Sequence, residues 1–354
     1  MNARRRFLAG LSGTVAIAAA PPVLTRPRPR DIILLRFREM RLPDAHQLPL
    51  ATRHLLSAGT HFATASSASL TSFDDDLVIR SGKYPHQFGQ LGLMPSPWTS
   101  HVAPPPRLLD ETFRSLGFGY TRFEDGVPIA APQQLDDSPS GMLSEVVITK
   151  HPGEARSAAL ARADAWLDRS IARAAWKRRA RPLVVVIASD FTGSGEGWNN
   201  RGLDLIVAPP PGVATLPAGS SASSIDVMPT LLDWVHAGAA ADSLPGRSLL
   251  RSTAGGRSVE NAPLYMSRDF AGVGRFAPVR AMRTARHVIA RRLPASGGIG
   301  RRWDDIQLFD LERDPACLTD VSADPAYGGT VAALARRLDR WRRATQDPWI
   351  SATV

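Results

Sequence analysis

The sequence predicts an α/β fold in which a mostly parallel central sheet is flanked by helices. Three short apolar runs, at residues 31–35, 183–188 and 203–207, lack an alternating pattern, which is typical of strands buried on both faces. Alanine, leucine and tryptophan recur at helical spacing over residues 154–178, between the first two runs. Strands that alternate with helices favour a parallel sheet covered on both faces.

Other elements are expected on either side of this core. A helix is predicted near residues 49–58, after the first strand. Residues 251–261, rich in Gly, Ser and Arg, are typical of a linker, and strand-like segments follow at residues 263–267, 279–290 and 306–311. A closing helix is expected near residues 326–345, because four apolar side chains recur there at spacings of three and four and form one stripe: Val331, Leu334, Leu338 and Trp341.

The first residues have the pattern of a twin-arginine export signal. Arg4 and Arg5 are followed by one spacer and then by Phe7 and Leu8. The apolar run 8–20 has the length of a signal peptide and is too short to span a bilayer, which needs roughly 20 residues. We expect residues 1–20 to be removed and the protein to be periplasmic or secreted, with no stable membrane anchor, since no later apolar run is long enough.

Composition and charge narrow the range of partners. The 354 residues are 44% hydrophobic, and the formal charge of +10 falls by three to +7 without the arginines of the signal. Export argues against nucleic acid as a partner, whereas a sulfated or phosphorylated small molecule or glycan fits a basic protein. The simpler interpretation is a solvated arginine surface. Cys317 is the only cysteine, which excludes an internal disulfide and a cysteine metal site.

Several phrases, in order over nearly the whole chain, resemble those of one family. The strongest is Ser-Gly-Lys-Tyr-Pro-His-Gln-Phe-Gly at residues 81–89. The chain thereby resembles the sulfatases of the alkaline phosphatase superfamily, which implies an α/β core over residues 27–250 and a smaller antiparallel sheet with a closing helix over residues 262–354. The other matching phrases lie at residues 30–35, 56–68, 225–233, 245–249, 280–289 and 308–315.

The resemblance implies a divalent cation held by carboxylates at the strand ends, but this chain departs from that pattern. Arg38 and Glu39 stand where sulfatases have a pair of aspartates, and an arginine cannot ligate a cation. Glu39 is either a weak ligand or an ordinary surface or salt-bridged residue. The second ligand pair keeps Asp190 and has Phe191 in its second place. Asp190 is thus either a metal ligand or a carboxylate retained for folding.

The nucleophile position is also altered. Counting back from Gly82 places Ser72 there, but Asp74 and Asp76 replace the Pro and Arg of the motif that directs conversion to formylglycine. Conversion is therefore not expected, and Thr71 is a weaker alternative nucleophile. The run of three aspartates, residues 74–76, is either a relocated cation site or an N-cap or solvated turn.

Two functions follow from these departures. The first is a catalytically degenerate sulfatase-like protein without a cofactor, which binds an anionic ligand through Arg38 and Arg122, or binds a partner protein. The alternative is a divergent sulfuric or phosphoric ester hydrolase with Ser72 or Thr71 as nucleophile. Its calcium or other divalent cation would be held by three carboxylates: Glu39, Asp74 and Asp190.

Overall fold

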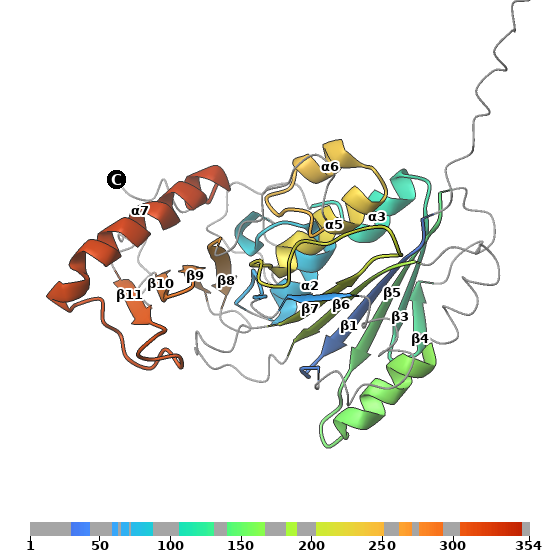
Figure 1. The fold of residues 1–354 in the computed structure, drawn as a ribbon, viewed down its shortest axis with the longest axis horizontal. Coiled ribbons are helices and arrows are strands. Elements are labelled where there is room, and N and C mark those ends of the chain that lie inside the picture. The colour runs from blue at the N-terminus through green and yellow to red at the C-terminus, as the bar shows by residue number, and fades with distance from the viewer. Residues whose placement is uncertain are drawn as a thin grey trace, which may run out of the picture.

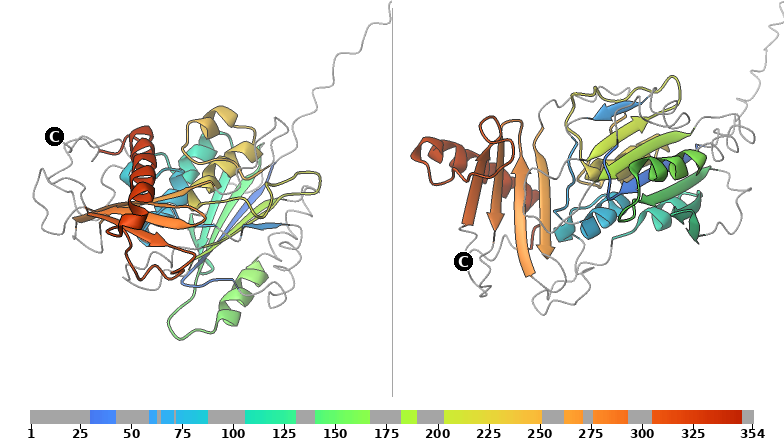
Figure 2. Two further views of the ribbon diagram at one scale, coloured as in Figure 1. Left: turned by 60° about the vertical axis from the view of Figure 1, so that its left-hand side comes forward. Right: turned by 90° about the horizontal axis from the view of Figure 1, so that it is seen from below.

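A computed structural model shows two sheets that lie side by side, with helices packed against both (Figures 1 and 2). None of its helices combines the length and apolar character needed to cross a membrane, among the residues described. Those residues are 30–42, 59–62, 65–70, 72–87, 106–130, 140–166, 182–189, 203–250, 262–270, 276–292 and 305–348. The expected signal and the helix expected near residues 49–58 lie outside them.

The larger sheet has seven strands in the order β2-β7-β6-β1-β5-β3-β4. Its centre, β6-β1-β5-β3, is parallel, as the sequence predicts. The run at residues 203–207 also forms a strand, β7, but it pairs antiparallel with β6, contrary to a purely alternating pattern. The strands are β1 (Ile32–Arg38), β2 (Thr60–Phe62), β3 (Gly119–Glu124), β4 (Val127–Ala130), β5 (Met142–Thr149), β6 (Leu183–Ser189) and β7 (Asp204–Ala208).

Both faces of this sheet are buried, which explains why β1 has no polar–apolar alternation in its first half. Ile32 and Leu34 face helices α2 (Ser72–Ser81), α3 (Leu109–Ser115) and α5 (Val227–Trp234). Ile33 and Leu35 pack instead against the helical segment 156–166. Figure 1 shows α2, α3, α5 and the short α6 (Gly238–Asp242) together on one side of the sheet. The prediction of a sheet covered on both faces is confirmed.

The smaller sheet is antiparallel, in the order β11-β10-β9-β8. The strand-like segment 279–290 is two strands and not one, because a turn at residues 284–286 separates them. Helix α7 (Gly328–Ala344) follows and buries Leu338 and Trp341, members of the predicted stripe. The strands are β8 (Leu264–Phe270), β9 (Phe276–Arg283), β10 (His287–Arg292) and β11 (Asp305–Asp310), with short 3-10 turns at η2 (Pro85–Gln87), η3 (Ser224–Asp226) and η4 (Pro325–Tyr327).

Two of the sequence phrases, 225–233 and 245–249, pack against each other. The Arg247 backbone N–H donates to Asp226 Oδ1 at 2.9 Å, and Ser248 Oγ donates to Asp233 Oδ2 at 2.6 Å. Gly246 is required at the closest approach, since a Cβ there would lie 2.3 Å from the carbonyl oxygen of Ile225. These two phrases are therefore structural, and they hold α5 against one face of the larger sheet.

Candidate functional site

The second half of β1 is polar on the side that faces α2. Arg36 and Arg38 continue the face of Ile32 and Leu34, and strands β3 and β5 place Arg122 and Glu145 beside them. These side chains form one group with residues from α2 and α3. We call this group the strand-end network: Arg36, Arg38, Asp76, Arg80, Asp110, Tyr120, Arg122, Glu124 and Glu145.

Asp76, from α2, lies at the centre of the network. Its Oδ1 accepts hydrogen bonds from Arg36 Nη1 and Arg38 Nη2, both at 2.5 Å, and Arg122 Nη2 lies 4.0 Å from the same oxygen. Burial opposes ionisation of Asp76, but the three arginines outweigh it and hold the pKa of this carboxyl well below its usual range. Asp76 is therefore a charged anchor for two strands.

Glu145 forms a second centre and is fully buried in the sheet. Its Oε1 accepts from Arg36 Nη1 at 3.0 Å, and its Oε2 accepts from the Tyr120 hydroxyl at 2.6 Å. Burial disfavours the charged carboxylate, yet Arg36, Arg122 and Arg80 lower the pKa of Glu145. A carboxylate without exposure is stable in this position only because these cations surround it.

The network is balanced in charge. Arg38 Nη1 donates to Glu124 Oε1 at 2.6 Å, and Arg80 Nη2 donates to Asp110 Oδ1 at 3.0 Å. Four arginines thus meet four carboxylates: Arg36, Arg38, Arg80 and Arg122 against Asp76, Asp110, Glu124 and Glu145. The positive and negative groups of the network are therefore equal in number.

Hydrogen-bond donors nevertheless exceed acceptors within the network. Arg122 lies 3.8–4.0 Å from three carboxylates, but it makes no hydrogen bond to the residues described. The buried Nε atoms of Arg36, Arg80 and Arg122 are likewise without an acceptor in those parts of the chain. Buried N–H groups usually have acceptors, so these donors leave the hydrogen bonding of the network incomplete.

The structure brings together some of the residues singled out in the sequence. Arg38 and Arg122 both lie within reach of Asp76. Glu39 is the next residue after β1, partly exposed, with a backbone φ of +60°. Thr71 and Asp190 lie outside the described residues. Ser72 and Asp74 are in the first turn of α2, where the structure describes the backbone alone.

The run of aspartates is not a solvated turn. Asp75 and Asp76 lie inside α2 and not before it. Asp75 is buried and accepts from Ser67 Oγ at 2.5 Å, and burial raises the pKa of its carboxyl. The local sequence hid these roles because both partners of the aspartates, the Ser67 segment and the strand ends of the sheet, come from outside the helix.

A divalent cation does not fit the strand ends as the structure describes them. Arg38 stands where the sulfatase resemblance places a ligand, and the nearby carboxylates are already paired with arginines. Across the described ranges there is no group of three His, Cys, Asp or Glu side chains placed to hold a metal ion. A cation site of Glu39, Asp74 and Asp190 stays a prediction.

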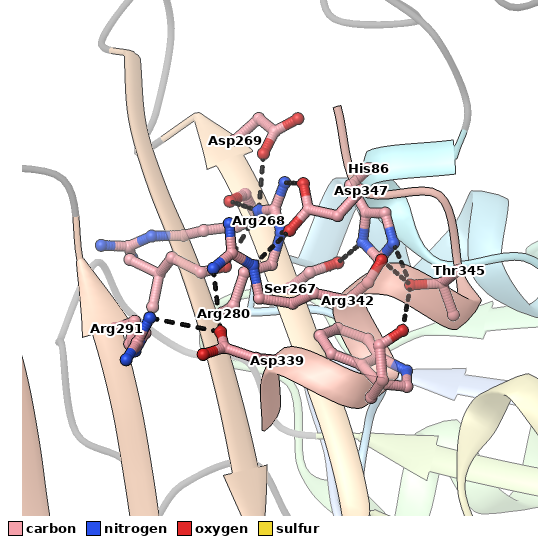
Figure 3. A network of polar contacts seen from close by, with 12 residues as sticks. His86, Ser267, Arg268, Asp269, Arg280, Arg291, Asp339, Arg342, Thr345 and Asp347 are labelled. Carbon is pink, nitrogen blue, oxygen red and sulfur yellow. Dashed lines mark hydrogen bonds and ion pairs between the residues drawn. The ribbon is translucent and has the colours of Figure 1, made fainter. Parts of the chain in front are cut away.

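The sequence phrase 81–89 leads to a different buried network, shown in Figure 3. His86 Nδ1 lies 3.1 Å from Ser267 Oγ on β8, and its Nε2 lies 2.9 Å from Thr345 Oγ1 after α7. Thr345 Oγ1 donates to the Trp341 carbonyl oxygen, so it accepts from His86 Nε2–H, and Nδ1 accepts from Ser267. Next to it, Arg280 and Arg342 share Asp347. His86 thus connects η2 to the smaller sheet and to the end of α7.

Several solved structures share the fold of this chain. No family model and no curated protein matches the chain. A 2-O GAG sulfatase of known structure shares 14% identity, with a TM-score of 0.64 over 92% of this chain and 94% of its own. The phosphonate monoester hydrolase of Agrobacterium radiobacter shares 14%, with a TM-score of 0.59 over 90% and 96%. This chain has the sulfatase fold.

A third structure with the sulfatase fold was solved with its substrate, D-glucosamine-2-N,6-O-disulfate. It shares 9% identity, with a TM-score of 0.57 over 91% of this chain and 99% of its own. At identities this low, structural similarity establishes the fold alone. Sulfatases and phosphonate monoester hydrolases of the alkaline phosphatase superfamily share this fold. Because one fold serves several reactions, function must be argued from the strand-end network.

Proposed function

We propose that this protein is a catalytically degenerate member of the sulfatase fold, which binds a sulfated or phosphorylated ligand and does not hydrolyse it. The observation that carries this proposal is the pairing of Arg36 and Arg38 with Asp76 at the end of β1. The N-terminal pattern of Arg4, Arg5, Phe7 and Leu8 supports export of the protein through the twin-arginine pathway. No cofactor is needed for binding.

The positive charge of Arg38 supports a loss of metal-dependent catalysis. A divalent cation 4 Å from the Arg38 guanidinium would be repelled by about 8 kcal/mol at an effective dielectric constant of ~20. The carboxylates that could offset this repulsion, Asp76 and Glu124, already accept hydrogen bonds from Arg38. Without a cation, an unmodified Ser72 has no evident activating group.

The N–H groups of Arg122 that have no acceptor support a retained ability to bind an anion. Arg122 is held among Asp76, Glu124 and Glu145 without a hydrogen bond to them, and its side chain is 12% exposed. A planar guanidinium with free N–H groups suits two oxygens of a sulfate or phosphate group. Glucosamine disulfate, the substrate of one protein with this fold, supports a sulfated sugar as the first ligand to test.

The test uses mature protein purified from the periplasm of a producing bacterium. Finding the protein in that compartment also tests the predicted export. We expect no hydrolysis of 4-nitrophenyl sulfate, 4-nitrophenyl phosphate or a phenylphosphonate ester, with or without Ca²⁺, Mg²⁺ or Mn²⁺. Glucosamine sulfate should bind in calorimetry, and Arg122→Gln should weaken it about tenfold, the loss of one charge-assisted contact. Arg107→Gln, an exposed arginine elsewhere, is the matched control.

The alternative, a divergent hydrolase, has one observation in its favour. Ser72 is the first residue of α2, one turn before Asp76, and so lies near the strand ends. Hydrolysis that disappears in Ser72→Ala or Thr71→Ala would establish that function and overturn ours. Bound calcium and a formylglycine mass at Ser72 would point to the same conclusion.

A further inference from the structure

Helix α7 carries a second group of arginines, apart from the strand-end network. Four arginines are exposed within two turns of this helix, which runs along the smaller sheet at the periphery of the molecule (Figure 1). Leu338 and Trp341 occupy the opposite, buried face. We call the exposed group the α7 stripe: Arg336, Arg337, Arg340 and Arg343.

The carboxylate beside the α7 stripe is already paired with other arginines. Asp339 is the only acidic residue in α7, and it accepts from Arg291 Nη1 at 3.2 Å and from Arg342 Nη1 at 3.1 Å. Arg342 is buried and also donates to Asp347. The ion pairs among the described residues include none of the four stripe arginines. Their charges are therefore exposed, and no carboxylate of the described residues neutralises them.

Helix stability alone does not account for the stripe. Arg336 and Arg340, four residues apart, and Arg340 and Arg343, three apart, repel each other on the helix surface. Cations favour only the last turn of a helix, which explains Arg343 but not Arg336 and Arg337 in the middle of α7. A polyanion laid along the stripe would relieve this repulsion.

We propose that the α7 stripe binds a sulfated polysaccharide. Its four positive groups are all guanidinium groups, whose planar forks suit sulfate oxygens. Arg336, Arg340 and Arg343 follow one line about 10 Å long, from the helical rise per residue, and Arg337 lies to one side of it, so the group matches a linear chain with repeated charges. The exposed face of α7 has no large apolar side chain to insert into a lipid surface and no aromatic side chain on which a base could stack.

The test measures the affinity of the full mature protein for heparin at about 0.15 M salt. Arg336→Ala with Arg340→Ala should weaken binding about 25-fold, about fivefold for each charge. The matched control is Arg107→Ala with Arg156→Ala, two exposed arginines on the other part of the molecule, which changes the net charge equally. This control should stay within twofold of the wild type, and chemically desulfated heparin should not bind.

Several results would overturn the inference. Equal losses in the two double variants would mean that overall charge alone attracts heparin. Tighter binding of anionic vesicles or of DNA than of heparin would assign the stripe to a membrane or a nucleic acid. Arg336→Lys with Arg340→Lys, which keeps the charge and removes the forks, should bind severalfold more weakly than the wild type; unchanged binding would contradict recognition by guanidinium. None of these binding measurements depends on hydrolysis or on Arg122.

Discussion

Asp76 shows how a single side chain decides what the strand ends can do. It accepts from Arg36 and Arg38 through one oxygen, and its side chain is 20% exposed. In a metal-dependent site, a carboxylate in this position would be available to a cation. Here the two arginines occupy it, so the chemistry of the site follows from which partner the aspartate has, and not from whether an aspartate is present.

Asp76→Asn is therefore expected to destabilise the protein by about 3 kcal/mol, since an amide leaves Arg36 and Arg38 without a counter-charge. Urea unfolding measures this loss. Asp242→Asn, at an exposed position of α6 with no ion pair among the described residues, should change stability by less than about 0.5 kcal/mol. The same Asp76 variant should bind sulfated ligands more tightly; equal stability of the two variants would mean that the network is not stabilising.

Among elements, His86 has the widest reach. It lies in η2 and contacts Ser267 of β8 and Thr345 beyond α7, so three elements meet at one imidazole. Burial, with the nearby Arg280, lowers the pKa of His86 to about 3. The folded protein therefore keeps this ring neutral at a pH where the unfolded chain, with a histidine pKa near 6.5, is protonated.

This difference predicts a loss of stability in mild acid. The folded-state pKa is depressed, so the contribution of neutral His86 is complete above about pH 6.5 and falls as the pH drops toward 3. At pH 5 the loss is about 2 kcal/mol. His86→Gln keeps a donor and an acceptor but cannot titrate, so its stability should fall less between pH 7 and pH 5.

Unfolding curves of both proteins at the two pH values test this expectation. Burial raises the pKa of the Asp226 carboxyl to about 6. The contribution of Asp226 to stability therefore increases as the pH falls from about 6 to about 3.8, opposite to that of His86. Asp226 is present in both proteins, so its contribution cancels in the comparison. Parallel pH curves for the wild type and the variant would show that His86 is not the group responsible.

At the scale of the whole molecule, one apolar cluster spans the two sheets. Val78 and Tyr84, beside the larger sheet, pack in the same cluster as Met282 and Leu308 of the smaller sheet and Trp341 of α7. An isolated bridge between Ser69 and Ser267 joins the backbones at the same place. Neither part buries this surface without the other, so the two sheets should be stable only together.

We therefore expect a single unfolding transition in urea, with tryptophan fluorescence and far-ultraviolet circular dichroism changing together. Leu338→Ala removes a fully buried side chain from the shared cluster and should lower both curves by the same amount, about 2–5 kcal/mol. Ala332→Gly, on the exposed side of α7, gives the cost of a change in the helix alone. Two separated transitions would show that the sheets fold independently.

The elements that depend on local pattern follow from the sequence. β1 and β6 are short apolar runs, and α7 carries apolar residues at helical spacing along one side. Each of these elements could therefore be predicted without knowledge of the rest of the chain. Strands β3 and β5 could not, because Arg122 and Glu145 interrupt their apolar patterns. Those polar residues are buried only because partners from other strands neutralise them.

By itself, the sequence determined the fold class, the smaller sheet with its closing helix, and the replacement of one expected carboxylate by Arg38. Only the tertiary structure decided what the replacement means. Arg36 meets Asp76 across 40 residues and Glu145 across 109 residues. Such pairs depend on strand order and on the placement of α2, which no local spacing encodes. Charge balance at the strand ends is therefore a property of the folded chain.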